Sequence, residues 1–144
     1  MILVDANLLL YAYNTEDQRH QAARRWLEET LSEPEEVRLA WVTILAFLRI
    51  GTNPRAFARP FSLAEAVGHV SAWLQHPRLA PLEPGEGHWR ILADLLAVAQ
   101  ARANLVMDAH LAALAMEHGA ILCTTDRDFT RFRGLKVRYP LESD

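Results

Sequence analysis

The chain has 144 residues, which is enough for one domain with a buried core and too few for several domains of ordinary size. Its 51% hydrophobic and 23% charged composition is that of an ordinary globular protein, and its net charge of −3 argues against a protein that coats nucleic acid through a general positive field. One cysteine excludes an internal disulfide, and without a secretory signal or an apolar run of bilayer length we expect a cytoplasmic protein with no membrane partner.

The first half of the chain predicts one strand followed by helices. The short β-branched run I-L-V at residues 2–4 indicates a buried strand that ends at Asp5. Apolar residues at helical spacing follow, and Ser62 with Glu65 forms a capping-box pattern. The helices predicted in this half lie at about residues 17–34, 42–50 and 62–75.

The second half alternates strands with helices. Strands are predicted at residues 79–82, 120–123 and 136–139, and helices at about 89–101 and 108–118. Asn104 breaks the helical pattern, so Asp108 is expected to begin its helix, which His118 and Gly119 end. Alternating strands and helices predict a single domain over residues 1–144, a three-layer α/β/α sandwich with a mainly parallel central sheet.

Four aspartates follow the predicted strands or begin a predicted helix. Sites in parallel sheets form at the carboxyl ends of the strands, where Asp5 ends the first strand and Asp126 and Asp128 follow the strand at 120–123. A helix that leads into a parallel strand runs antiparallel to it, so the first turn of the helix at Asp108 lies at the same edge. The acids are therefore expected to gather at one rim of the sheet.

Each of these acids has a structural explanation when taken alone. Asp5 can bond turn amides, Asp108 can favour a helix N-terminus, and Asp126 or Asp128 can cap a short turn. Together, several close carboxylates repel one another unless a cation neutralises them. Oxygen ligands select hard ions, so the set predicts Mg²⁺ or Mn²⁺ rather than zinc.

Four segments in order carry a family resemblance: V-D-A-N, F-L-R-I-G-T-N-P, D-A-H-L-A-A-L-A-M-E-H-G-A and T-T-D-R-D-F. They resemble a PIN domain, and in particular the VapC-type toxin ribonucleases of bacterial toxin–antitoxin pairs. The likeness runs from Val4 to about Pro140. It implies a PIN-like fold, a metal-dependent endoribonuclease that cleaves an RNA substrate, a homodimer, and a cognate antitoxin that blocks the site.

On the family pattern, Asp5, Asp108 and Asp126 match the acidic positions, and Asp128 is an auxiliary candidate. The resemblance implies that these acids hold one or two Mg²⁺ (or Mn²⁺) ions. Asp5 and Asp108 would bind the ion directly, while Asp126 would act through the ion or its water. A water activated by the ion would then hydrolyse the RNA.

One position departs from the family. PIN domains usually carry a glutamate on the second helix, where this chain has Ala46 in T-I-L-A-F-L-R. Asn7, Thr43 or a water are the candidates to replace it; the other possibility is a second ion that binds weakly or not at all. The alternative function is therefore a catalytically weakened PIN-fold module that binds RNA or protein without cutting.

Arginines close to the acids are candidates for phosphate contacts, because arginine binds phosphate bidentately. Arg127, Arg131 and Arg133 follow Asp126, although a solvated charged turn explains them equally well. Arg49 could instead pair with one of the acids.

Two other families place an aspartate at a strand end. A haloacid-dehalogenase-like phosphatase would carry D-x-D where this chain has D-A-N. A receiver-type phosphoacceptor would need a lysine near the site, and the single lysine, Lys136, lies inside the last predicted strand. Both fit the sequence less well than a nuclease.

Overall fold

The computed structural model describes residues 1–142. Over these residues the strands are β1 (Ile2–Val4), β2 (Val37–Ala40), β3 (Leu79–Leu82), β4 (Ile121–Cys123) and β5 (Val137–Arg138). The helices are α1 (Ala6–Tyr13), α2 (His20–Ser32), α3 (Trp41–Gly51), α4 (Leu63–Gln75), α5 (His88–Ala99) and α6 (Asn104–His118), with a short 3-10 helix, η1 (Arg127–Arg131), after β4. None of the helices in this part of the chain has both the length and the apolar character needed to cross a membrane.

The five strands form one sheet in the order β3-β2-β1-β4-β5, and every neighbouring pair is parallel. The central strand β1 pairs on both sides, with Ile2 opposite Val37 of β2 and Ile121 of β4. Val4 lies opposite Cys123, so the residues that follow β1 and β4 emerge next to each other. The predicted parallel sheet is confirmed, and its register positions the acidic rim.

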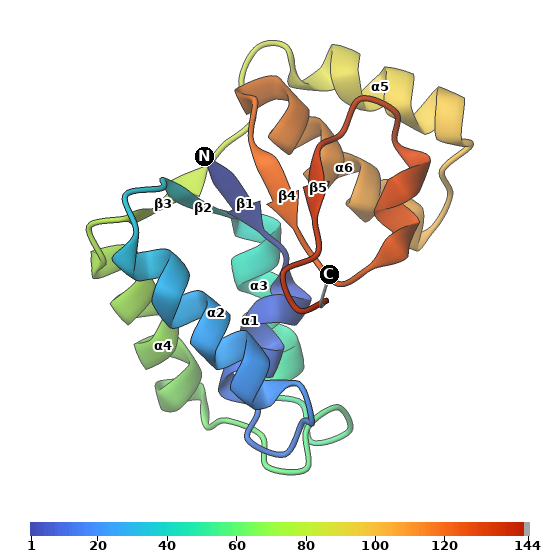
Figure 1. The fold of residues 1–144 in the computed structure, drawn as a ribbon. Coiled ribbons are helices and arrows are strands. Elements are labelled where there is room, and N and C mark those ends of the chain that lie inside the picture. Colours follow the sequence, from blue (N-terminus) through green and yellow to red (C-terminus); the bar gives the residue numbers. More distant parts are fainter. Residues whose placement is uncertain (143–144) are drawn as a thin grey trace.

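Helices cover both faces of the sheet (Figure 1). Alternate side chains of β1 point to opposite faces, as the pleat requires. Ile2 and Val4 belong to a core shared with α1, α2, α3 and α4, whereas Leu3 belongs to a second core shared with α5, α6 and η1. The three-layer α/β/α sandwich is therefore confirmed.

Two elements were not predicted, α1 and β2. The sequence of α1, A-N-L-L-L-Y-A-Y, is apolar over most of its surface, and Leu8, Leu9, Leu10 and Ala12 are all buried. A helix that is buried on most sides loses the periodicity by which amphipathic helices are recognised. The four residues of β2, V-R-L-A, are too few to give a pattern that distinguishes them from a turn.

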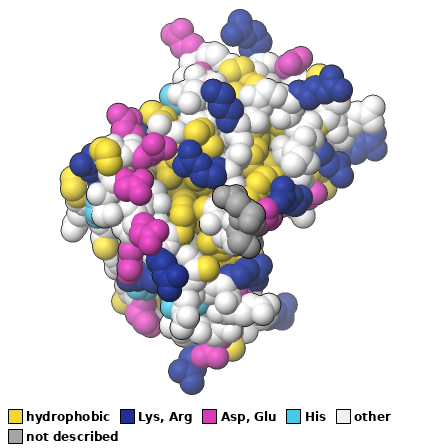
Figure 2. All heavy atoms as spheres, in the orientation of Figure 1, with side chains coloured by type: hydrophobic (Ala, Val, Ile, Leu, Met, Phe, Trp, Pro, Cys, Tyr) yellow, Lys and Arg dark blue, Asp and Glu magenta, His cyan; other side chains and the backbone are white. Residues whose placement is uncertain are grey.

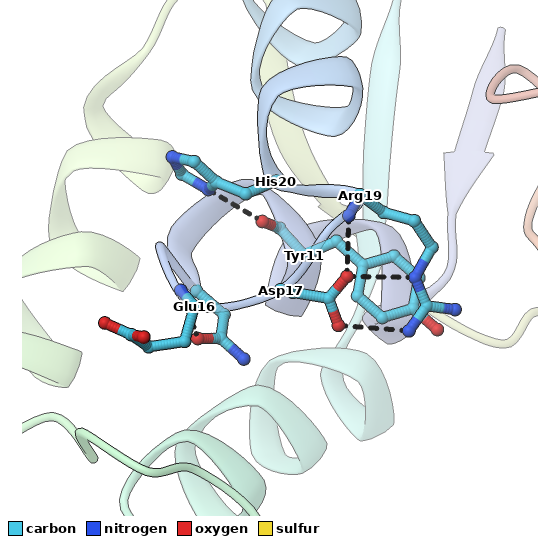
Figure 3. Close-up of polar contacts among 6 residues, drawn as sticks. Tyr11, Glu16, Asp17, Arg19 and His20 are labelled. Carbon is cyan, nitrogen blue, oxygen red and sulfur yellow. Dashed lines mark hydrogen bonds and ion pairs between the residues drawn. The ribbon is translucent and has the colours of Figure 1, made fainter.

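The loop from α1 to α2 is fixed by polar contacts among its own residues (Figure 3). Asp17 accepts hydrogen bonds from the Arg19 backbone N–H at 2.8 Å and from the Arg19 guanidinium at 3.0 Å. That guanidinium lies over the Tyr11 ring, 3.7 Å from its centroid. His20 Nδ1 donates to the Tyr11 carbonyl at 3.0 Å, which ties the start of α2 to the end of α1.

The predicted start of the helix at Asp108 is wrong. Helix α6 begins at Asn104, which places Asp108 at the beginning of its second turn. The chain turns between α5 and α6 through Gln100 and Ala103, whose φ angles are 50° and 52°. Positive φ angles are uncommon at residues other than glycine, and residues 100–103 include no glycine or proline that would predict a turn here.

Other boundaries agree with the predictions to within a few residues. The capping box of α4 is confirmed: Ser62 Oγ accepts from the Glu65 N–H at 3.1 Å, and Glu65 Oε1 accepts from the Ser62 N–H at 3.0 Å. Gly119 ends α6 with a φ of 66°, as the His-Gly stop predicted. The helices predicted at 17–34 and 89–101 are shorter in the structure, and the last strand is only Val137–Arg138.

Candidate active site

Asp5 is fixed at the carboxyl end of β1 by two hydrogen bonds. As the N-cap of α1, its Oδ1 accepts from the Ala6 N–H at 2.8 Å. Its Oδ2 accepts from the hydroxyl of Thr124, the residue directly after β4, at 2.7 Å. Burial raises the pKa of Asp5, the bonds from Thr124 and Ala6 partly offset this, and the nearby charge of Asp126 adds to the rise. The orientation of this carboxylate is therefore set by the pairing of β1 with β4.

Asp126 forms the turn that leads from β4 into η1. Its Oδ1 accepts a hydrogen bond of 2.8 Å from the Asp128 N–H, and this bond caps the N-terminus of η1. Its own N–H donates to Thr124 Oγ1 at 3.0 Å. Thr124 is completely buried, and its hydroxyl therefore links the Asp5 side chain to the Asp126 backbone.

Carboxylates of Asp108, Asp126 and Asp128 converge at this rim. Each offers one oxygen that lies within 4.8 Å of the oxygens of the other two. The pKa of Asp108 is raised to about 6, first because burial removes water and then because Asp126, Asp5 and Asp128 repel its negative charge. Within residues 1–142 no other group of His, Cys, Asp or Glu side chains forms a comparable set.

This donor set fits a hard divalent cation. All ligands are carboxylate oxygens, which suit Mg²⁺ or Mn²⁺ and not a thiolate or imidazole-seeking metal. The negative charges of Asp126, Asp5 and Asp128 repel that of Asp108, and a cation bound among them would offset this repulsion. Asp128, which the sequence suggested only as an auxiliary, belongs to this close group, whereas Asp5 lies beside it.

A cavity of about 300 Å³ adjoins the carboxylates. Asp5 and Asp108 line one part of it, together with Thr43, and Ala46 lies on its α3 side. Ala46, where the family resemblance led us to expect a glutamate, therefore faces the site. Of the two residues considered as replacements, Thr43 lines the cavity, while Asn7 Oδ1 is buried without a hydrogen-bond partner in the described part of the chain.

The candidate arginines lie in different places. Arg127 pairs with Glu142, and its guanidinium is 3.8 Å from the centroid of the Tyr139 ring. Arg131 and Arg133 line a different cavity, next to α5. Arg49 lines the cavity that contains Asp5 and Asp108 but makes no ion pair with any residue from 1 to 142.

Comparison with known families agrees with this geometry. The model of the PIN domain family matches residues 2–135, which include all four aspartates. The chain belongs to the PIN domain family. The PIN domain of this chain is 44% identical over 140 residues to Ribonuclease VapC37 of Mycobacterium tuberculosis, covering 97% of each chain. It is 38% identical over 142 residues to VapC ribonuclease Mb2897 of Mycobacterium bovis, covering 99% of this chain and 97% of that protein.

Solved PIN-domain structures share the fold at lower identity. The VapBC2 complex of Rickettsia felis, bound to a DNA fragment from its promoter, superposes with a TM-score of 0.69 at 18% identity, covering 96% of this chain and 98% of that one. Mycobacterium tuberculosis VapC20, described as a sarcin-ricin loop cleaving toxin, superposes with a TM-score of 0.65 at 19% identity. The match covers 94% of this chain and 99% of that one. At such identities these structures support the fold of this PIN domain alone.

Sequence reasoning missed Thr124 as part of the site. The signal was present in T-T-D-R-D-F: a small hydroxyl residue directly after a buried strand and two residues before an acid. A buried hydroxyl must find hydrogen-bond partners, and carboxylates at the rim of the sheet are the nearest ones. Its partner Asp5 is 119 residues away in the sequence, so only the strand order reveals the contact.

Proposed function

We propose that this PIN domain is a divalent-metal-dependent endoribonuclease, the toxin of a toxin–antitoxin pair, which hydrolyses phosphodiester bonds of RNA at the carboxylate rim. The observation that carries the proposal is the convergence of oxygens from Asp108, Asp126 and Asp128 within 4.8 Å, with Asp5 held beside them by Thr124. The relatives named ribonucleases, which match along nearly their whole length, support the same function.

In this proposal Asp108, Asp126 and Asp128 hold the ion, which is Mg²⁺ (or Mn²⁺), and Asp5 completes the set. Each Asp5 oxygen accepts one hydrogen bond and keeps a second lone pair for the cation. When bound, a divalent ion supplies the positive charge that polarises a phosphate and lowers the pKa of an attacking water. Asp108 must be ionised to bind, and its pKa of about 6 means that it loses its proton only near neutral pH in the absence of the ion.

Charge is unevenly distributed over the surface in a way that suits an RNA substrate. Figure 2 shows several acidic side chains gathered on the left of this face, while the right of the face carries more basic than acidic side chains. Phosphates are attracted to basic surfaces even when the net charge is negative. Arg127 follows Asp126 directly and remains our candidate for a flanking phosphate, which would replace its pairing with Glu142. Arg131 and Arg133, which line the cavity next to α5, are the other candidates.

Partners follow from the same proposal. Structural relatives that are VapBC complexes support a cognate antitoxin as the partner of this chain. A homodimer is supported by exposed apolar side chains on α5, where Trp89 is 69% and Val98 is 63% exposed. We place the protein in the cytoplasm, with its proposed RNA substrate, and treat residues 1–144 as one PIN domain.

The alternative, a PIN module that binds without cutting, has less support. It was motivated by Ala46, which removes one carboxylate, but the structure retains four others at the rim. A binding module has no need for a site in which burial and neighbouring carboxylates raise the pKa of Asp108.

Cleavage assays with matched variants test the proposal. RNA hairpins are incubated with the purified chain in Mn²⁺, in Mg²⁺ and in EDTA, and the products are mapped at nucleotide resolution. Asp126→Asn should abolish cleavage, whereas Asp94→Asn, an exposed acid on α5, should cut at the wild-type rate. Cleavage in EDTA, or full activity of Asp126→Asn, would show that the carboxylate rim is not the catalytic site.

A further inference from the structure

The cavity beside the carboxylates has apolar walls that catalysis by a metal ion does not require. Helices α3 and α6 cover opposite faces of the sheet, and residues of both line an open cavity of about 300 Å³ at its rim. Leu45 and Ala46 line it from α3, and Met107 lines it from α6. Asp5 and Asp108 belong to the same cavity, so an apolar group bound there would lie next to the reacting phosphate.

Two of the wall residues are large, apolar and left in water. Leu45 is 59% exposed and Met107 is 52% exposed. Covering such side chains is favourable because it removes apolar surface from water. The polarisable sulfur of methionine also makes favourable contacts with aromatic rings. These walls therefore suit a flat, largely apolar ligand.

Ala46 provides the space for that ligand. A longer side chain at this position would fill part of the volume next to Asp5 and Asp108. Alanine leaves this side of the cavity small and uncharged. A volume of about 300 Å³ is at the lower end of the range for small-molecule sites, which suits one ring system and not a larger ligand.

Arg49 adds a positive charge to the same cavity. Six residues of helix separate it from Thr43, which is about 9 Å along the axis at 1.5 Å per residue. Its guanidinium is free of ion pairs with residues 1–142. The cavity thus has carboxylates, apolar walls, and an arginine without an ion pair among residues 1–142 that lies more than one and a half helical turns along α3 from Thr43.

We propose that this cavity binds the unpaired nucleobase next to the scissile bond, between Leu45 and Met107, while Arg49 contacts a neighbouring phosphate. The inference rests on the proposed ribonuclease function and narrows its substrate to RNA in which that base is out of the helical stack. A paired base cannot enter such a pocket, because its faces and its Watson–Crick edge are already occupied in the duplex. Ala46, Leu45 and Arg49 are then residues that determine specificity.

The first test fills or weakens the pocket without changing the carboxylates. Ala46→Leu and Leu45→Ser should each raise KM for a cleaved RNA hairpin about tenfold, which corresponds to about 1.4 kcal/mol. The increase in melting temperature on addition of Mn²⁺ should stay at the wild-type value in both, because no ion ligand is changed. Leu63→Ala is the control, since Leu63 is an apolar residue of α4 that is 71% exposed and does not line the cavity.

The second test changes the RNA. Hairpins with an abasic nucleotide on one or the other side of the cleaved bond are compared with the intact hairpin. One of the two abasic hairpins should have a higher KM than the intact hairpin when the wild-type chain cleaves it. Ala46→Leu should not raise the KM for that hairpin any further, because loss of the base and filling of the pocket remove the same contact. Arg49→Gln should lower the slope of log(kcat/KM) against log salt by about one.

The outcomes separate this inference from the function on which it rests. A wild-type chain that cleaves no RNA in Mn²⁺ or Mg²⁺ overturns both. Wild-type cleavage combined with an unchanged KM for both Ala46→Leu and Leu45→Ser overturns the nucleobase pocket alone. If the wild-type chain cleaves both abasic hairpins and the intact hairpin with the same KM, the nucleobase pocket is likewise overturned. Leu45 is on the surface, so Leu45→Ser remains informative even if Ala46→Leu fails to fold.

Discussion

Asp17 and Asp126 form the same local turn in two regions of the molecule, with opposite consequences for charge. In both turns Oδ1 accepts a hydrogen bond of 2.8 Å from the backbone N–H two residues later, that of Arg19 in one and of Asp128 in the other. In the loop between α1 and α2 the partner's side chain is a guanidinium 3.0 Å away (Figure 3). At the rim of the sheet, the side chain two residues after Asp126 is a second carboxylate, that of Asp128. Asp108 adds a third carboxylate to this group.

The pKa shifts follow this difference. The hydrogen bond from Arg19 is the main reason why the pKa of Asp17 lies below its usual value. The pKa of Asp108 is raised to about 6 by burial and by the charges of Asp126, Asp5 and Asp128. The first turn contains its own cation, while the second leaves negative charge uncompensated within the chain. An acid in a turn thus indicates a functional site when its neighbours in space add charge of the same sign.

The largest effect on RNA cleavage is expected when an arginine is placed beside Asp126, as Arg19 lies beside Asp17 in the loop between α1 and α2. Asp128→Arg places a guanidinium two residues after Asp126, as Arg19 stands after Asp17. Cleavage of RNA in Mn²⁺ should fall by at least about a hundredfold, as for other losses of a key electrostatic group at a reacting centre. Melting temperature in EDTA should stay the same or rise, because repulsion is replaced by attraction. Arg19→Asp is the reciprocal control and should leave cleavage unchanged.

A second change removes the hydroxyl that joins the two halves of the rim. Thr124→Val deletes the hydrogen bonds to Asp5 Oδ2 and from the Asp126 N–H, both in a buried place. Leaving such groups unsatisfied should lower the free energy of unfolding by about 1–3 kcal/mol, measured by urea denaturation. Thr124→Ser, which restores the hydroxyl, should recover most of the loss. Equal stability of the valine variant and the wild type would show that the bridge contributes nothing.

The pH dependence of stability sharpens the comparison further. Because the pKa of Asp108 is higher in the folded chain, its favourable contribution is fully present below about pH 3.8 and is lost as pH rises through about 6. Asp108→Asn should therefore stabilise the ion-free protein at pH 8, by about 1 kcal/mol after allowance for solvent screening. The two proteins should differ little at pH 4. Urea denaturation in EDTA at both pH values measures this, and a destabilised variant at pH 8 would contradict the repulsion.

The smallest effect is expected at the compensated turn. Asp17→Asn removes a largely solvent-screened pair with Arg19 and should cost about 0.5 kcal/mol of stability. Its pKa is lowered in the folded chain, so this contribution is present at neutral pH and is lost as pH falls through the acidic range. RNA cleavage should be unaffected, and a large loss of cleavage would mean that this loop also belongs to the active site.

Much of the fold could be predicted because its signals are local. The runs I-L-V and A-I-L-C identified β1 and β4, and the acids that follow them could be assigned to one rim from the rules for parallel sheets. The capping box before α4 and the glycine after α6 are likewise short-range patterns. The sequence alone therefore predicts that Asp5 and Asp126 lie at the same edge of the sheet.

The rest depends on tertiary contacts that the sequence does not display. Asp108 was assigned to the rim, but its helix begins four residues earlier, after a turn with positive φ at Ala103. The close approach of Asp128 depends on the 3-10 turn that Asp126 caps, and the bond of Thr124 to Asp5 depends on strand order. The cavity beside Ala46 is lined by residues from the start of α1, from α3 and from α6, which are far apart in the sequence, so no single segment encodes it.

The most direct test of a cation at the rim is a calorimetric titration of Mn²⁺ into the wild-type chain and into Asp108→Asn at pH 7.5, with melting temperatures recorded alongside. The wild type should bind the ion and gain about 2.7 kcal/mol of stability when Mn²⁺ exceeds its Kd a hundredfold, whereas the variant should gain far less. Absence of binding to the wild type, or the same binding and stabilisation in both proteins, would contradict a metal site built on these carboxylates.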